Sequence, residues 1–348
     1  MMTFLTILAL AILAYFAVAI ALIFTQRVVE LDNNSPMDFD PDDVRYRLPQ
    51  KELEIAKARD GSDIPYRLYR VADGAKSKNV PLLVFSHGST NHSAPYEPLA
   101  QMISAAGIAD VVLPDMRGHG PLTQNRGVTD YVGQMEDDFA DLIEQIRRNH
   151  NQNIIVGGHS LGGGFAVRFA AGKYRRLVDK AVLLCPYLNT RSPTNRPHAG
   201  GFTRVLYRRA LGLAMLFGLR KFFKRLPTVQ FNFGQDFRDW ERSWMSTEFY
   251  NYATMMGFGP RQAWQQDVKK LPPFLVVIGS EDEVFHARQY QPTMSPLNPN
   301  GQYQVLEGVD HIGVSTLPKT VEVIEAFLGN NDNADDASDD LKANQSAA

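Results

Sequence analysis

Short, continuous apolar runs alternate with longer amphipathic segments along most of the chain. The runs "VPLLVFSHG", "ADVVLPD", "NIIVGG", "KAVLLCPYL", "PPFLVVIG" and "GQYQVL" predict strands, most of them buried on both faces of a sheet. Helical spacing is found in "APYEPLAQMISAAG", "DYVGQMEDDFADLIEQIRRNH", "SLGGGFAVRFAAGKY" and "LPKTVEVIEAFLG". Residues 51–72 alternate about a "DGSD" turn and predict a β-hairpin. The pattern therefore predicts an α/β fold, with a mostly parallel sheet flanked by helices on both faces.

The chain opens on an uncharged apolar run, Phe4–Phe24. Its length suits a membrane-spanning helix, because a bilayer core needs about 20 helical residues. A secretory signal usually has a shorter apolar region and a basic start, which "MMTF" lacks, although "AVA" at Ala17–Ala19 leaves cleavage open. We expect a retained single-pass transmembrane anchor over residues 1–27. Basic residues follow the run and none precedes it, which favours the cytoplasmic side for the remainder of the chain.

Composition then divides the rest of the chain. Residues 28–48 are acidic and rich in turn-forming residues, and we interpret them as a linker. The α/β domain is expected over residues 49–329, with an insertion at about 188–268 that is far longer than an ordinary connection. Residues 330–348 are acidic and lack aromatic residues, which predicts a disordered tail.

The overall charge and the cysteine content exclude several classes of function. A net charge of −2 gives no indication of nucleic-acid binding. Cys185 is the single cysteine, so no intrachain disulfide can form. The sequence has neither CxxC nor HExxH, and we expect no metal and no cofactor.

The stretch "IIVGGHSLGGG", Ile154–Gly164, breaks a predicted strand into glycines around one serine. It lacks the lysine of a phosphate-binding loop, and no register fits the G-x-G-x-x-G of a dinucleotide site. It does fit G-x-S-x-G, with Ser160 between a buried strand and a helix. A turn of this kind lifts a serine hydroxyl clear of the sheet, so Ser160 is a candidate nucleophile. The alternative is a glycine-rich turn without chemistry.

A nucleophilic serine needs a base, and the base needs an acid to orient it. His311 lies in "GVDHIG", after the last predicted strand, and Asp282 lies in "GSEDEV", after the strand before it. Glu281 and Glu283 are equally plausible acids by position. The chain order Ser, Asp, His is the order expected when three loops emerge at the carboxyl edge of one parallel sheet.

The reaction also needs donors for a developing oxyanion. The backbone N–H of Leu161, directly after the serine, is the first candidate. Ser89 in "SHGSTNH" is the second, since Gly88 permits a sharp turn before it. We interpret the neighbouring His87 as a structural residue and not as a second base.

With these residues in place, the chain resembles the α/β-hydrolase superfamily, and within it the monoacylglycerol lipase/lysophospholipase-like (serine aminopeptidase-like) branch. The resemblance rests on "FSHGSTNHSAPYEPLAQMISAAGIADVVLPDMRGHG", "GGHSLGGG", "GSEDEV" and "GVDH". It implies an eight-stranded, mostly parallel sheet with a helical cap over the site. By position it implies Ser160 as the nucleophile, Asp282 as the acid and His311 as the base. It implies the backbone N–H groups of Ser89 and Leu161 as the oxyanion donors.

The insertion has two halves of different character. No acidic residue occurs between Asp179 and Asp236, and basic residues flank an apolar centre, "ALGLAMLFGL". Such a segment is typical of a helix in a membrane interface, or of a cap helix packed on the core with solvated arginines. The second half, "DFRDWERSWMSTEFYNYATMMGFG", is rich in aromatic residues and methionine. It suits either an acyl-chain pocket or the core of the cap.

Taken together, these features predict a membrane-anchored serine hydrolase that cleaves carboxylic esters. The expected partners are a membrane and a small-molecule or lipid ester, of monoacylglycerol or lysophospholipid type, with no nucleic acid. A thioesterase, acyltransferase or peptidase would use the same triad and stays open. A catalytically silent scaffold on the same fold is the alternative of another class.

Overall fold

A computed structural model describes residues 2–28, 50–72, 80–196, 202–233 and 245–329 of the chain. The acidic tail and all of the predicted linker beyond residue 28 lie outside the described residues.

One large sheet is the centre of the fold, and in the described residues it has eight strands in the order β1-β2-β4-β3-β5-β6-β10-β11. In that order they are Glu54–Lys57, Asp63–Tyr69, Asp110–Pro114, Leu82–Ser86, Ile154–His159, Lys180–Leu184, Phe274–Gly279 and Gly301–Leu306. β1 pairs antiparallel with β2 as the predicted hairpin, and β2 pairs antiparallel with β4. All other neighbours are parallel. The predicted α/β fold with a mostly parallel sheet is confirmed.

Helices cover both faces of this sheet, since every residue of β5 is buried. α3 packs against α11, and α4 packs against α5 through the ring of Phe139, which meets those of Phe165 and Phe169. The α-helices of the domain are α3 (Glu97–Ala105), α4 (Gln134–Ile146), α5 (Leu161–Ala171), α8 (Tyr252–Gly257), α9 (Trp264–Val268), α10 (Tyr290–Met294) and α11 (Pro318–Gly329). Short 3₁₀ helices are η1 (Ala94–Tyr96), η2 (Arg175–Leu177), η5 (Ala287–Gln289) and η6 (Gly313–Ser315).

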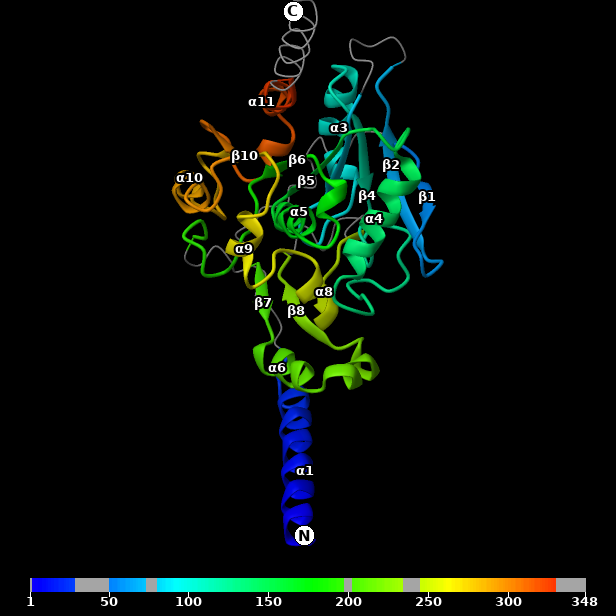
Figure 1. Ribbon diagram of the computed structural model, residues 1–348, viewed down its shortest axis with the longest axis vertical. Helices are drawn as coiled ribbons and strands as arrows, with labels where there is room; N and C mark the ends of the chain where they lie inside the picture. The colour runs from blue at the N-terminus through cyan, green and yellow to red at the C-terminus, as the bar shows by residue number, and fades with distance from the viewer. Residues whose placement is uncertain (1, 29–49, 73–79, 197–201, 234–244, 330–348) are drawn as a thin grey trace, which may run out of the picture.

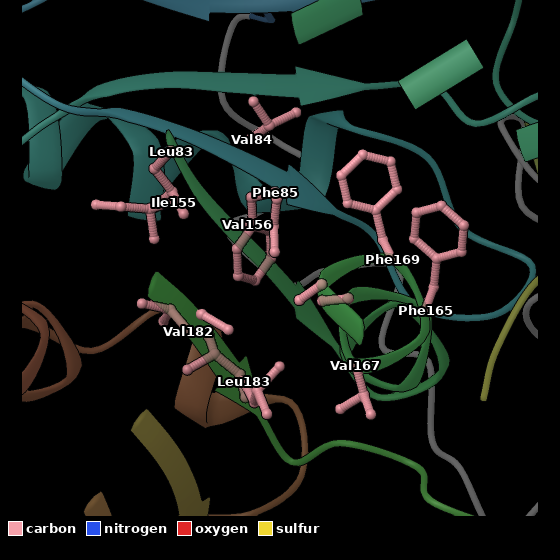
Figure 2. Packing of buried hydrophobic residues seen from close by; sticks show 14 of the residues in the cluster. Leu83, Val84, Phe85, Ile155, Val156, Phe165, Val167, Phe169, Val182 and Leu183 are labelled. Carbon is pink, nitrogen blue, oxygen red and sulfur yellow. The ribbon is translucent and has the colours of Figure 1, made fainter. Parts of the chain in front are cut away.

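The core is built from the apolar runs that predicted the strands. Figure 2 shows Leu83 of β3, Val156 of β5 and Val182 of β6 on adjacent strands, with Phe165 and Phe169 on the helix α5. The register is fixed by the parallel ladders, for example Leu83 opposite Ile155. Because these strands are buried on both faces, a ligand is expected at their carboxyl ends, among the loops beyond them.

The insertion forms a cap, which we define as residues 202–233 and 245–260. It contains the expected helix, α6 (Tyr207–Met215), followed by the 3₁₀ helix η3 (Phe217–Phe223). It also contains an antiparallel three-stranded sheet of β7 (Thr203–Val205), β8 (Pro227–Phe231) and β9 (Phe249–Asn251). The sequence pattern did not indicate this sheet, because strands of three to five residues are too short to show a period.

The N-terminal apolar run is a single helix, α1 (Met2–Phe24). Residues Thr3–Phe24 have a mean hydropathy of 2.9 and are long enough to cross a membrane. In Figure 1, α1 points away from the domain, and its carboxyl end meets α6 of the cap.

Candidate active site

The serine singled out by the sequence lies at a sharp turn between β5 and α5. Ser160 has φ 55° and ψ −118°, a left-handed backbone conformation that side chains other than glycine rarely adopt. A Cβ at Gly158 would lie 2.3 Å from the carbonyl oxygen of Gly162, and a Cβ at Gly162 would lie 2.2 Å from that of His87. Both flanking positions of the turn therefore require glycine.

The acid and the base predicted from the sequence are hydrogen-bonded to each other. His311 Nδ1 donates to Asp282 Oδ2 at 2.8 Å, and both side chains are almost fully buried. The other carboxylate oxygen, Oδ1, accepts the backbone N–H groups of Val284 at 2.8 Å and Phe285 at 2.7 Å. Burial alone raises the pKa of Asp282, but the His311 imidazole and the Phe285 N–H outweigh it and hold this pKa below its ordinary value. Asp282 is thus an ionised carboxylate that fixes the imidazole.

The two neighbouring acids have other positions. Glu281 is exposed, and Glu283 Oε2 accepts the backbone N–H of His311 at 3.1 Å without reaching its ring. Among the three adjacent acids that the sequence left open, Asp282 is the one that contacts the imidazole.

The second ring nitrogen of the base is available. His311 Nε2 is buried and has no hydrogen-bond partner in the described part of the chain. No hydrogen bond joins it to Ser160 in these ranges, but His159, the residue before the serine, packs on the His311 ring with centroids 4.6 Å apart. The structure therefore brings the serine turn and the base together and leaves the nitrogen that would take a proton unpaired.

A chain of hydrogen bonds that the sequence did not reveal connects the site's loops. The N–H of Gly88 donates to the hydroxyl of Tyr96 at 3.0 Å, and this hydroxyl lies 2.9 Å from His159 Nδ1. His159 Nε2 lies 2.9 Å from the carbonyl oxygen of His311. Because a carbonyl only accepts, His159 donates from Nε2. The loop after β3 and the loop that contains His311 are thus connected through the imidazole of His159.

The two candidate oxyanion donors lie beside the serine. A Cβ on Gly88 would be 3.6 Å from the Cβ of Ser160, which places the loop containing Ser89 against this serine. Leu161 is the first residue of α5. Within the described ranges, neither backbone N–H, of Ser89 or of Leu161, has a hydrogen-bond acceptor. These two N–H groups are thus compatible with the predicted oxyanion donors.

His87 is buried and not placed as a base. Its Nε2 accepts the N–H of Met116 at 3.1 Å, so its proton is on Nδ1, which donates to the carbonyl oxygen of Gly88 at 2.8 Å. Burial lowers the pKa of His87 to about 4, and the ring is neutral. This geometry agrees with the structural role that the sequence suggested.

The cap closes over the site from the other side. Gly259 lies against Leu161, because a Cβ there would come within 2.7 Å of the leucine Cδ1. Phe258 stacks edge-on against the ring of His87, with centroids 5.6 Å apart. The hydroxyl of Tyr250 accepts the backbone N–H of Thr90 at 2.8 Å. The aromatic half of the insertion thus contacts the loop that contains Ser89, and no local signal in the sequence identified Tyr250.

Three side chains that could bind a metal ion lie close together at this point. They are His159, Cys185 and His311, and one potential ligand atom from each lies within 4.8 Å of the other two. Both nitrogens of His159 are already hydrogen-bonded, and burial beside the Asp282 charge raises the pKa of the Cys185 thiol well above its ordinary value. A protonated thiol and an engaged imidazole do not suit a metal ion, so this cluster belongs to the support of the base.

Curated relatives match parts of the chain. It is 39% identical over 113 residues to 2-(acetamidomethylene)succinate hydrolase from Mesorhizobium japonicum, covering 32% of this chain and 38% of that protein. It is 29% identical over 109 residues to a monoglyceride lipase homolog from monkeypox virus, covering 31% and 39%. The matched region thus spans about two fifths of each relative's own length.

Solved structures match a larger share of the chain at lower identity. Monoglyceride lipase from Saccharomyces cerevisiae aligns with a TM-score of 0.57 and 17% identity, covering 82% of this chain and 96% of the yeast enzyme. A carboxylesterase from Bacillus subtilis aligns with a TM-score of 0.53 and 16% identity, covering 92% and 98%. At this level of identity the likeness shows the fold.

A family model decides the membership. The model described as "Serine aminopeptidase, S33" matches residues 77–312, which is more than half of the chain and runs through the serine turn, the acid and the base. This chain belongs to the serine aminopeptidase S33 family of α/β hydrolases.

Proposed function

We propose that this protein is a membrane-anchored serine hydrolase that cleaves carboxylic esters of lipids, of monoacylglycerol or lysophospholipid type. The observation that carries the proposal is the 2.8 Å hydrogen bond from His311 Nδ1 to Asp282, which leaves His311 Nε2 unpaired next to the Ser160 turn. A base oriented in this way accepts a serine proton, because the carboxylate stabilises the imidazolium that forms.

The proposed reaction proceeds in two halves. His311 Nε2 takes the proton of the Ser160 hydroxyl while the oxygen attacks the ester carbonyl. The resulting oxyanion accepts hydrogen bonds from the N–H groups of Ser89 and Leu161. The intermediate collapses, the alcohol leaves with the proton from His311, and the acyl group stays on the serine oxygen. Water, activated by the same imidazole, then attacks the acyl-enzyme and releases the carboxylic acid.

The lipid character of the substrate is supported by the cap and by α1. Tyr250 and Phe258 of the cap are buried in the core beside the loop that contains Ser89, so this side of the candidate site has apolar surroundings, which suit a lipid ester better than a peptide. Helix α1 is long and apolar enough to hold the enzyme at a membrane, where lipid esters are concentrated. The basic residues that follow α1 favour the cytoplasmic side.

Fluorophosphonate labelling of the full-length protein tests the nucleophile. The natural chain and a Ser104→Ala control should label, and Ser160→Ala should not. A panel of monoacylglycerols, lysophospholipids, thioesters and peptides then ranks substrates by kcat/KM. Labelling of Ser160→Ala equal to that of the natural chain would refute the mechanism, and a preference for thioesters or peptides would replace the lipid ester by one of these classes.

Membrane attachment has its own test. The full-length protein should stay with the membrane pellet after alkaline carbonate extraction. Release into the supernatant would contradict the anchor without affecting the hydrolase chemistry.

A further inference from the structure

The carboxyl end of α1 is packed into the cap and does not stand free of it. Ala19 and Ile23 are fully buried and form a small apolar cluster with Leu213 and Leu216, separate from the main core. The ring of Phe24 meets that of Phe223 edge-on, with centroids 6.1 Å apart. The helix that would enter the membrane therefore shares a core with α6 and η3.

One glycine permits the close approach of the two helices. A Cβ on Gly212 would lie 2.6 Å from the carbonyl oxygen of Ala19 and 2.7 Å from Cγ1 of Ile23. Because Ala19 also ends the "AVA" sequence, its burial against α6 argues that α1 is kept as part of the cap and is not a cleaved signal.

A buried arginine closes the end of α1. The guanidinium of Arg209 donates to the carbonyl oxygens of Ile23 at 3.3 Å, Gln26 at 3.3 Å and Pro227 at 2.9 Å. In the described part of the chain its partners are all carbonyls, and burial lowers the pKa of this arginine. A cation at a helix carboxyl end satisfies the unpaired carbonyls and the helix dipole. Arg209 thus joins α1 to α6 and to the first residue of β8.

Large apolar side chains are exposed around this junction. Tyr207 is 72% exposed, Phe217 is 70% exposed and Phe222 is 73% exposed. Phe217 also has φ 43°, an unfavourable backbone conformation for a residue with a side chain. Apolar groups gathered in this way on one region of a surface are typical of a membrane or protein contact.

The same region carries an excess of positive charge, although Lys224 pairs with Asp130 at 2.6 Å. Lys221 and Arg225 are exposed and form no ion pair with any described residue. Arg208 is also exposed and donates to the Thr25 hydroxyl at 2.7 Å, beside the end of α1. No acidic residue occurs in the sequence from α6 through β8. Cations next to exposed aromatic side chains match the headgroup region of an anionic bilayer.

We propose that the end of α1, α6 and η3 form one membrane platform, which binds the anionic headgroups of the bilayer that α1 enters. The inference rests on the membrane anchoring proposed above and adds a second contact, with its own lipid selectivity. A bilayer is favoured over a protein partner because α6 and η3, which carry these exposed aromatic and basic residues, pack at the end of α1 where that helix leaves the domain (Figure 1). Seated in this way, the cap would lie between the membrane and the sheet, so that lipid approaches the site through the cap.

A fluorescent probe on the platform of the full-length protein tests this arrangement. Leu219→Cys, 47% exposed, accepts a thiol-reactive probe, and the fully buried Cys185 does not. The protein is placed in vesicles of phosphatidylcholine, alone or with one third phosphatidylglycerol, and lipids brominated in the acyl chains quench the probe. We expect strong quenching in the vesicles with phosphatidylglycerol and weaker quenching without it.

Charge reversal provides the decisive comparison. Lys221→Glu with Arg225→Glu should weaken partition of the platform into anionic vesicles by about thirtyfold or more, since each surface cation contributes to headgroup attraction. Arg175→Glu with Arg176→Glu, an exposed basic pair on η2, is the matched control and should have no effect. Equal quenching in both lipid mixtures, an equal effect of the control pair, or no quenching at all would overturn the proposal.

Two further readouts separate this result from failure of the proposed function. A probe at Leu10→Cys within α1 should be quenched in both lipid mixtures. If it is not quenched, α1 does not anchor the protein in the membrane. Fluorophosphonate labelling of the same samples reports Ser160 independently of the lipid composition. If the Leu10→Cys probe is quenched and Ser160 is labelled while the Leu219→Cys probe is not quenched, the membrane platform is refuted and the proposed function is not.

Discussion

The hydroxyl of Tyr250 in the cap accepts the backbone N–H of Thr90 at 2.8 Å, one residue after the candidate oxyanion donor Ser89. The same hydroxyl lies 2.9 Å from Nε2 of His119. His119 Nδ1 faces the carbonyl oxygen of Arg117 at 3.1 Å and carries the proton, so Tyr250 donates to Nε2. Burial lowers the pKa of His119 well below its ordinary value, which keeps it a neutral acceptor. One cap side chain thus joins the loop that contains Ser89 to a buried histidine.

Tyr250→Phe should therefore reduce both stability and turnover. It leaves the Thr90 N–H and His119 Nε2 without a partner inside the protein, which costs about 1–3 kcal/mol in the free energy of unfolding. We expect a lower kcat with a smaller change in KM, because the loop that carries Ser89 loses its support. Urea unfolding and steady-state ester hydrolysis measure the two effects.

Tyr303→Phe is the matched control for this variant. The Tyr303 hydroxyl is buried without a hydrogen-bond partner in the described residues, so its removal should leave stability unchanged or raise it. If both variants behave alike, the contact between Tyr250 and Thr90 has no special role.

Asp282→Asn should nearly abolish turnover while the protein remains folded. The amide cannot hold His311 in the required tautomer or stabilise the imidazolium, and kcat should fall by about four orders of magnitude. Glu281→Gln, at an exposed position, should keep full activity. A large loss of activity in Glu281→Gln, or only a small loss in Asp282→Asn, would show that Asp282 is not the catalytic acid. Circular dichroism checks the fold of each variant.

Gly162→Ala should destabilise the protein through a backbone collision. The new Cβ would lie 2.2 Å from the carbonyl oxygen of His87 and 2.5 Å from that of Ser86, and neither can move freely at the end of β3. We expect a loss of about 1–3 kcal/mol in the free energy of unfolding, together with lower activity because α5 shifts. Gly329→Ala, where a Cβ meets nothing within 4 Å, should be neutral in the same urea titration.

Acid should destabilise the protein through the buried histidines. The pKa of His87 is about 4 in the folded chain, against about 6.5 for an ordinary histidine. The unfolded chain therefore binds a proton at pH values where the folded chain does not. This contribution to stability is complete above pH 6.5 and is lost as the pH falls toward 4, by roughly 3 kcal/mol.

The variant His87→Asn tests this origin of the pH dependence. The free energy of unfolding should fall less steeply between pH 6.5 and 4 than in the natural chain, whatever its value at neutral pH. His150→Asn, at an exposed position, should keep the natural slope. An identical slope for the natural chain and for His87→Asn would show that His87 is not the group responsible.

The sequence by itself determined the strands, the helices beside them and the serine turn. Apolar runs such as "NIIVGG" and "FLVVIG" show their burial locally, and the glycines around Ser160 are required by contacts within one short segment and its neighbouring strand. The order of Ser160, Asp282 and His311 indicated a common sheet edge, because parallel strands end on the same side.

Only the tertiary structure decided which of three adjacent acids meets the imidazole, and that Tyr96, His159 and Tyr250 connect the loops around it. It also revealed that α1 packs on α6 through Gly212 and Arg209. These contacts join residues far apart along the chain and leave no period or spacing in the sequence. They are set by how the helices and loops pack against the sheet, and packing is a property of the whole fold.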